Sequence, residues 1–266
     1  MDFPASPPGP GLWSLLVLAV VQGVTEFLPV SSDGHLVLVQ TWLASGGPHL
    51  AIDVALHIGT LAAVLVVYRR ELSALLRELG AGSARELGLL ALASLPLAIV
   101  GLAWKHQIEE LFESGRAAAI GLFVSAGFLL FGERARRRHA RGPAGRALGW
   151  REALWIGGFQ ALAPLPGVSR SGTTIATALV LGIPSERAAR FSFLLSIPAV
   201  GGAVLLEVPE LVREGGFGPE LLLAVLLTFV VGVAALRFLL SFLGRGAFLW
   251  CAFYCLALGT GALLLT

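Results

Sequence analysis

The order of hydrophobic and polar positions along the chain predicts a helical membrane protein. Helical spans need about 20 predominantly apolar residues each, and candidates lie at 51–68, 87–104, 117–131, 188–206, 221–240 and 247–264. Two further apolar stretches, 11–28 and 155–165, instead run into polar segments that contain proline and glycine. Irregular backbone at membrane depth is tolerated where it is buried in protein or lines a cavity. Each of these two stretches is therefore predicted to begin a re-entrant helix-loop-helix hairpin, ending near Leu43 and Leu181.

The charges between the apolar stretches predict the topology. Residues 134–150 are rich in arginine, which marks a cytoplasmic loop. The acidic loops at 105–116 and 208–220 then lie outside, and the turns at 69–86 and near Arg245 lie inside. On this topology the first hairpin enters from outside and the second from inside, and each is followed by three spans.

The expected fold is therefore an all-α polytopic membrane protein of two inverted-topology repeats. The first covers about 11–133 and the second about 151–266, in one membrane domain joined by the basic loop 134–150. Placing residues 22–34 on 160–172 without a gap aligns Gln22 with Gln160, Val30 with Val168, Ser31 with Ser169 and Gly34 with Gly172. Matching interrupted segments in inverted halves point to a binding site where the repeats meet.

Composition agrees with this class. Hydrophobic residues make up 56% of the 266 residues and charged residues 14%, against about 25% charged residues in ordinary globular chains. The formal net charge is only +2. The basic cluster occupies one loop without interleaved aromatic residues, so a nucleic-acid partner is not expected.

The tip of the first hairpin places ionisable side chains at membrane depth, where they are costly and mark a functional site by default. Glu26, Ser32 and His35 offer a carboxylate, a hydroxyl and an imidazole within ten residues. These are the groups of an activated nucleophile with acid–base assistance. Gln22 shares a helix face with Glu26, and Ser31 supplies a second hydroxyl.

The tip of the second hairpin has the composition of an anion site. Free N–H groups at a helix start, a guanidinium and hydroxyl donors together favour phosphate. The residues concerned are Ser169, Arg170, Ser171, Gly172, Thr173 and Thr174. If the two tips meet, the first brings catalysis and the second neutralises charge, which is the layout of a phosphoryl-transfer site.

Both tips resemble the signatures of a known family. Residues 22–35, Gln-Gly-Val-Thr-Glu-Phe-Leu-Pro-Val-Ser-Ser-Asp-Gly-His, resemble the first signature of the undecaprenyl-diphosphate phosphatase family, also known for bacitracin resistance. Residues 166–174, Pro-Gly-Val-Ser-Arg-Ser-Gly-Thr-Thr, resemble its second signature. Segments 53–60 and 189–198 are also similar to family segments, and the likeness runs from about Leu12 to the last helix.

The resemblance implies hydrolysis of undecaprenyl diphosphate to undecaprenyl phosphate and phosphate. This reaction recycles the lipid carrier of cell-wall synthesis on the outer face of the bacterial inner membrane. The implied partners are the polyisoprenyl diphosphate substrate and bilayer lipids. The implied catalytic residues are Glu26, Ser32, His35 and Arg170, and the implied substrate-binding residues are Gln22, Ser31, Ser169, Ser171, Gly172, Thr173 and Thr174.

Two positions depart from the commonest family pattern. Gln22 replaces a glutamate, which leaves Glu26 as the only carboxylate of that pair. Asp33 stands where a small hydroxyl residue is more usual, and an anion beside a diphosphate should repel it. The repulsion is avoided if Asp33 caps its helix or if, with Glu26, it holds a divalent cation such as Mg²⁺ or Ca²⁺.

Several alternatives stay open at the level of sequence. The nucleophile is Ser32, His35 or a water molecule activated by Glu26. A transporter or flippase for a phosphate-bearing lipid or anion would share the inverted repeats and the anion site, although it would not need Glu26 and His35 beside two serines. Polar residues at Asp53, His57, Thr60 and Arg190 are interpreted as structural groups that either support the site residues from behind or pack helices together. The oligomeric state is open, with a homodimer among the forms considered.

Overall fold

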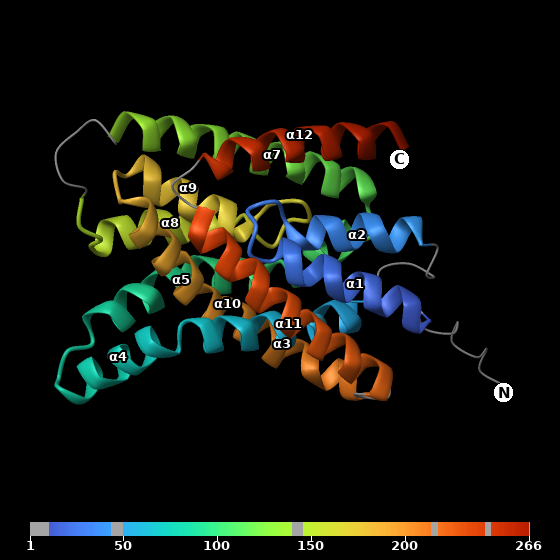
Figure 1. The fold of residues 1–266 in the computed structure, drawn as a ribbon, viewed down its shortest axis with the longest axis horizontal. Helices are drawn as coiled ribbons and strands as arrows, with labels where there is room; N and C mark the ends of the chain where they lie inside the picture. Colours follow the sequence, from blue (N-terminus) through green and yellow to red (C-terminus); the bar gives the residue numbers. More distant parts are fainter. Residues whose placement is uncertain (1–10, 44–49, 140–145, 214–217, 243–245, 266) are drawn as a thin grey trace.

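The computed structural model describes residues 11–43, 50–139, 146–213, 218–242 and 246–265, and their regular secondary structure is all α-helix (Figure 1). The helices are α1 Leu12–Thr25, α2 Ser32–Trp42, α3 Leu50–Val67, α4 Arg69–Gly80, α5 Arg85–Ala103, α6 Lys105–Phe112, α7 Gly115–His139, α8 Trp150–Gln160, α9 Arg170–Val180, α10 Ser185–Arg213, α11 Pro219–Phe242 and α12 Ala247–Leu265. Within the described ranges, α5, α7, α10, α11 and α12 are long and apolar enough to cross a membrane. The pair α3–α4, bent by 71°, gives a sixth candidate span. The prediction of a polytopic helical membrane protein is confirmed.

Both predicted hairpin segments are broken helices. Helix α1 ends at Thr25, three residues before the predicted end, and α2 begins at Ser32; α8 and α9 are separated by residues 161–169. The two returning helices start in the same way. Ser31 Oγ accepts a hydrogen bond from the Gly34 N–H at 3.2 Å, and Ser169 Oγ accepts one from the Gly172 N–H at 3.0 Å. These are N-cap bonds, and their residues are two of the pairs that the sequence aligned between the halves.

Four segments predicted as loops are partly helical, and those predictions were wrong. The turn at 69–86 contains α4, and the loop at 105–116 contains α6. Helix α7 extends through the first arginines to His139, and α10 continues past 206 to Arg213. Short helices with one apolar and one charged face have a low mean hydropathy, so a hydropathy pattern alone does not separate them from loops. Residues 140–145 of the predicted basic loop, 214–217 and Arg245 lie outside the described residues.

Each hairpin packs against helices that are distant in the sequence. Helix α1 lies on α11 and α2 on α7, while α8 lies on α5 and α9 on α7. Small residues allow these close approaches. A side chain at Gly23 of α1 would meet Val231 of α11 at 2.9 Å, and one at Gly157 of α8 would meet the Ala93 backbone oxygen of α5 at 2.4 Å. The hairpins are therefore seated inside the helical bundle.

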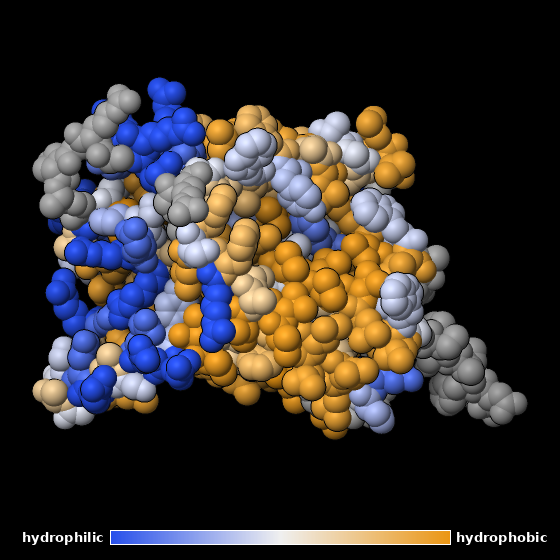
Figure 2. All heavy atoms as spheres, viewed as in Figure 1, coloured by the Kyte–Doolittle hydropathy of each residue, from blue (hydrophilic) through white to orange (hydrophobic). Residues whose placement is uncertain are grey.

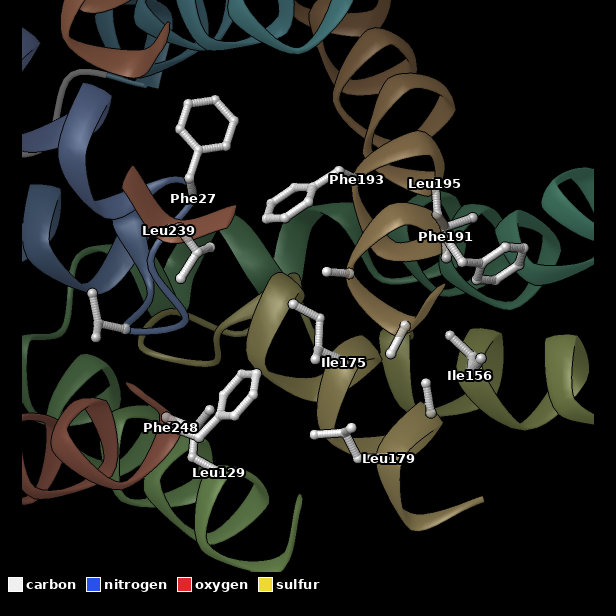
Figure 3. Close-up of a cluster of buried hydrophobic side chains, with 14 of the residues drawn as sticks. Phe27, Leu129, Ile156, Ile175, Leu179, Phe191, Phe193, Leu195, Leu239 and Phe248 are labelled. Atoms are coloured by element: carbon white, nitrogen blue, oxygen red, sulfur yellow. The ribbon is translucent and has the colours of Figure 1, made fainter. Parts of the chain in front are cut away.

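The core joins the first hairpin tip to the later helices. Phe27, fully buried in that tip, points toward Phe193 of α10, and their ring centroids are 6.0 Å apart in an edge-on arrangement (Figure 3). Figure 3 also shows Phe248 of α12 beside Leu129 of α7 and Ile175 of α9 at the centre of the cluster. Apolar packing thus holds both hairpins in one core.

Candidate active site

The tips of the two hairpins meet at Glu26. Arg170 Nη2 donates to Glu26 Oε1 at 2.9 Å, which joins residues that are 144 positions apart. Ser32 Oγ donates to Glu26 Oε2 at 2.7 Å. Gln22 Nε2 donates to the same oxygen at 3.2 Å, as their four-residue spacing predicted. The structure therefore brings together a carboxylate, a hydroxyl and a guanidinium that the sequence assigned to two separate segments.

Helix α7 positions the second tip. Ser125 Oγ donates to the Gly167 carbonyl at 2.8 Å and accepts the Ser169 N–H at 2.7 Å. One turn earlier, a side chain at Gly121 would lie 2.0 Å from the Pro166 carbonyl oxygen. The backbone of residues 166–169 thus rests directly on α7. This role of Ser125 could not be predicted from the sequence, because a serine within an apolar span is also common in plain helix packing.

The guanidinium of Arg170 is held from a second side. Its Nη1 donates to the Ser192 carbonyl of α10 at 3.2 Å. Thr173 and Thr174 donate to the Arg170 carbonyl at 2.9 and 2.8 Å, and Thr174 also shares a 2.6 Å hydrogen bond with Ser192 Oγ. Both threonines are fully buried. Their side chains therefore stabilise the start of α9, whereas Ser169 and Ser171 line the cavity described below.

His35 contacts Ser31 and Tyr254. Its Nδ1 lies 2.6 Å from the Ser31 carbonyl, which can only accept, so this nitrogen is the donor. Its Nε2 lies 2.8 Å from the Tyr254 hydroxyl, and the two rings stack with centroids 5.5 Å apart. Both ring nitrogens are thus engaged outside the Glu26 cluster. Ser31 itself has a φ of 68°, a value that L-residues rarely adopt.

The imidazole that does lie in the cluster is His57 of α3. Its Nε2 is 3.5 Å from Glu26 Oε2 and also 3.5 Å from Asp33 Oδ1. Its Nδ1 lies 2.7 Å from the Asp53 carbonyl, while the Asp53 carboxylate accepts two bonds from Gln40 Nε2 at 2.8 and 3.0 Å. The sequence interpretation of His57, as a group that supports the site or packs helices, did not specify this contact with Glu26. The available signal was an ionisable side chain in an apolar span.

A cavity of about 620 Å³ opens over the cluster. The two tips form one end of it with Glu26, Ser32, Asp33 and Arg170. Its wall continues along α5, α6 and α10 through mainly apolar residues such as Leu97, Leu102, Ala203 and Leu206. The polar side chains of the tips and the mainly apolar wall together suit a ligand with an anionic head and an apolar tail.

A salt bridge between α6 and α10 also lies in the cavity wall. Lys105 Nζ of α6 lies 2.6 Å from Glu207 Oε1 of α10 and 3.5 Å from Glu109 Oε1. The hydrogen bond to Glu207 is the main cause that raises the pKa of Lys105 above its usual value. Lys105 is therefore a cation at any physiological pH. It is the one lysine of the chain.

The two carboxylates that the sequence suggested as cation ligands do not form a ready site. Both oxygens of Glu26 already accept hydrogen bonds, and the Nε2 atom of His57 lies between Glu26 and Asp33. In the part of the chain that the structure describes, no group of three His, Cys, Asp or Glu side chains has metal-binding geometry. This donor set does not fit a preformed divalent-cation site.

Comparison with known proteins identifies the family. The model of the family described as bacitracin resistance protein BacA matches residues 15–261. An undecaprenyl-diphosphatase of Desulfosudis oleivorans is 42% identical over 92% of this chain and 94% of its own. Those of Desulforapulum autotrophicum and Mycobacterium tuberculosis are each 39% identical, over 93% and 97% of this chain and 96% and 95% of their own. The chain thus belongs to the BacA family of bacitracin resistance proteins.

Proposed function

We propose that this protein hydrolyses undecaprenyl diphosphate to undecaprenyl phosphate and inorganic phosphate. The observation that carries the proposal is Glu26, which joins Ser32 and Arg170 at a cavity whose wall is mainly apolar. The relatives named undecaprenyl-diphosphatase, similar over nearly their whole length, agree with it. Bacitracin resistance follows as the physiological consequence that the family description names.

Ser32 is the proposed nucleophile. Glu26 takes the proton from the Ser32 hydroxyl as the serine oxygen bonds to the terminal phosphorus. The bond from that phosphorus to the bridging oxygen breaks, and the oxygen leaves with its electron pair on undecaprenyl phosphate. Glu26 passes the proton it took from Ser32 to that leaving oxygen and is a carboxylate again. It then takes a proton from a water molecule as the water oxygen attacks the phosphoserine. That proton goes to the serine oxygen as the phosphorus–serine bond breaks and phosphate is released. A serine needs such an adjacent base, and at 2.7 Å Glu26 is within reach.

Arg170 binds and neutralises the phosphate oxygens in this scheme. A guanidinium is a planar donor that matches phosphate geometry. The N-termini of α2 and α9 add partial positive charge, with Ser31, Ser169 and Ser171 as further donors. His35 is proposed to stabilise the first hairpin tip and not to attack the phosphorus, because its two ring nitrogens already contact Ser31 and Tyr254. Gln22, Gly172, Thr173 and Thr174 support the site without lining the cavity.

The proposal for the whole chain is the inverted repeat expected from the sequence, with halves of about 11–133 and 151–266. The helix contacts support it. In this repeat, α1, α3, α5 and α7 of the first half correspond to α8, α10, α11 and α12 of the second. The contact of α1 with α11 then corresponds to the contact of α8 with α5. In the same way, the contact of α3 with α11 corresponds to that of α10 with α5. The lipid chain lies along the apolar wall between α5 and α10, and the site faces the outer side of the bacterial inner membrane.

Phosphate release from undecaprenyl diphosphate by protein purified in detergent tests the function. We expect release by the wild type and a loss of roughly 100-fold or more in Glu26→Gln, Ser32→Ala and Arg170→Ala. Substrate labelled on the terminal phosphate should leave acid-stable label on Ser32 after rapid quenching. Ser241→Ala is the matched control, at an exposed serine whose hydroxyl donates to the Phe238 carbonyl of its own helix.

Release in the wild type without label on the protein would favour attack by water over attack by Ser32. Folded wild type that releases no phosphate from this lipid would contradict the function itself. Retention of activity in a folded Glu26→Gln variant would contradict the assignment of Glu26 as the base.

A further inference from the structure

The cluster at the hairpin tips contains one carboxylate more than the proposed reaction uses. Glu26 is already compensated by Arg170 at 2.9 Å. Asp33 lies at the start of α2, lines the same cavity and keeps 27% of its side chain exposed. An uncompensated anion at this position would repel a diphosphate, because like charges a few ångströms apart near a protein surface repel each other.

His57 is the group that faces this second carboxylate. Among the described residues, His57 is the basic side chain with a nitrogen within 4.0 Å of the Asp33 carboxylate. Its Nε2 lies 3.5 Å from Asp33 Oδ1. It comes from α3, outside both hairpins, and reaches Glu26 at the same distance. One imidazole therefore lies between the carboxylates that the sequence suggested as ligands of a divalent cation.

The hydrogen bonds around His57 specify the protons on its ring. Nδ1 lies 2.7 Å from the Asp53 carbonyl oxygen, which only accepts, so Nδ1 carries a proton. Nε2 faces two carboxylate oxygens, which as ions also only accept. A proton on Nε2 satisfies both, and the ring then carries a positive charge. The same Asp53 contact fixes the direction of the ring.

We propose that His57 is a positioning residue that, as an imidazolium between Glu26 and Asp33, neutralises the second carboxylate and so permits the diphosphate to bind beside it. The inference rests on the proposed phosphatase function. It explains how Asp33 is tolerated at a position where the sequence analysis expected repulsion. His57 then occupies the place between Glu26 and Asp33 that the sequence suggested for a divalent cation.

A double-mutant cycle tests this coupling. The Michaelis constant and kcat for undecaprenyl diphosphate are measured for the wild type, His57→Gln, Asp33→Asn and the double variant, together with inhibition by inorganic phosphate. With Asp33 present, His57→Gln should raise KM by roughly 10- to 100-fold and weaken phosphate inhibition in parallel. In the Asp33→Asn background the same change at His57 should alter KM by less than about threefold.

His106→Gln is the matched control. His106 lies on α6 with its Nε2 also 3.5 Å from a carboxylate, that of Glu110, but both side chains are largely exposed and outside the cavity wall. This variant should leave KM and kcat as in the wild type. The control separates the loss of any histidine–carboxylate pair from the loss of this one.

Two results would overturn the inference while leaving the phosphatase function intact. One is an active His57→Gln variant whose KM equals that of the wild type. The other is an equal loss in both backgrounds, which indicates that His57 acts by packing. If His57→Gln does not fold with Asp33 present, recovery of a folded, active protein by Asp33→Asn supports the coupling, and failure in both backgrounds overturns it. A wild type that releases no phosphate refutes the function instead.

Discussion

At the scale of single residues, the imidazole that lies at Glu26 comes from outside the two hairpins. His35 lies in the signature with Glu26 and Ser32, yet its ring contacts Ser31 and Tyr254. His57 is 31 positions after Glu26 and lies against it. Proximity in the sequence therefore did not predict which imidazole lies at the carboxylate.

The contacts of His35 predict a structural effect on substitution. His35→Ala removes the donor to the carbonyl of Ser31, the residue with a positive φ, and should lower the stability by about 1–3 kcal/mol. Tyr254→Phe removes only the hydroxyl that contacts His35 Nε2 and should lower the stability by about 0.5–1.5 kcal/mol. Thermal unfolding in detergent, measured beside kcat, checks both. A His35→Ala variant that loses activity at an unchanged melting temperature would instead assign His35 to the chemistry.

At the scale of elements, α7 is the support on which the second tip rests. Ser125 is bonded to the backbone on both sides of Val168, and Gly121 allows the Pro166 carbonyl to approach. Helix α9 packs on the same helix. The position of Arg170 relative to Glu26 is therefore determined by a helix that contributes no side chain to the chemistry.

A pair of glycines on α7 tests this support. Gly121→Ala would place a carbon 2.0 Å from the Pro166 oxygen, a backbone atom that can move only with the whole tip. We expect a loss of about 1–3 kcal/mol in stability and a fall in kcat as Arg170 shifts. Gly127→Ala is the matched control on the same helix, because a side chain there meets nothing within 4 Å and alanine favours helix. Equal melting temperatures and activities of the two variants would refute the role of α7.

At the scale of the whole molecule, charge is distributed unevenly along the bundle. Figure 2 shows hydrophilic residues gathered at one end, on the left of the view, and an apolar surface over much of the rest of this face. That end includes α4 and the C-terminal part of α7, whose exposed arginines are Arg69, Arg70, Arg77, Arg134, Arg137 and Arg138. By the positive-inside rule this end is expected to face the cytoplasm.

Cysteine labelling checks this orientation. In a background with Cys251→Ala and Cys255→Ala, Gln107→Cys on α6 should react with a membrane-impermeant thiol reagent added to intact spheroplasts. Arg77→Cys on α4 should react only after the membrane is made permeable. Both positions are exposed, so access to the side of the membrane decides the result. The reverse pattern would place α6 and the cavity wall that it forms on the cytoplasmic side.

The sequence by itself determined the class of the fold and most of its elements. Runs of apolar residues predicted the spans, because a bilayer requires length and hydrophobicity that can be counted along the chain. Pro29, Gly34 and the serines predicted the hairpin breaks through local backbone preferences. The amphipathic helices α4 and α6 were missed, since their charged faces give them the hydropathy of loops.

Only the tertiary structure decided how the site is assembled. Glu26, Ser32 and Arg170 could be named from their segments, but their contacts depend on both hairpins being seated on α7 and α11. The approach of His57 depends in the same way on α3 packing between α10 and α11. Such contacts follow from close packing between distant segments, and a helical periodicity specifies which face is apolar without specifying which helix will cover it.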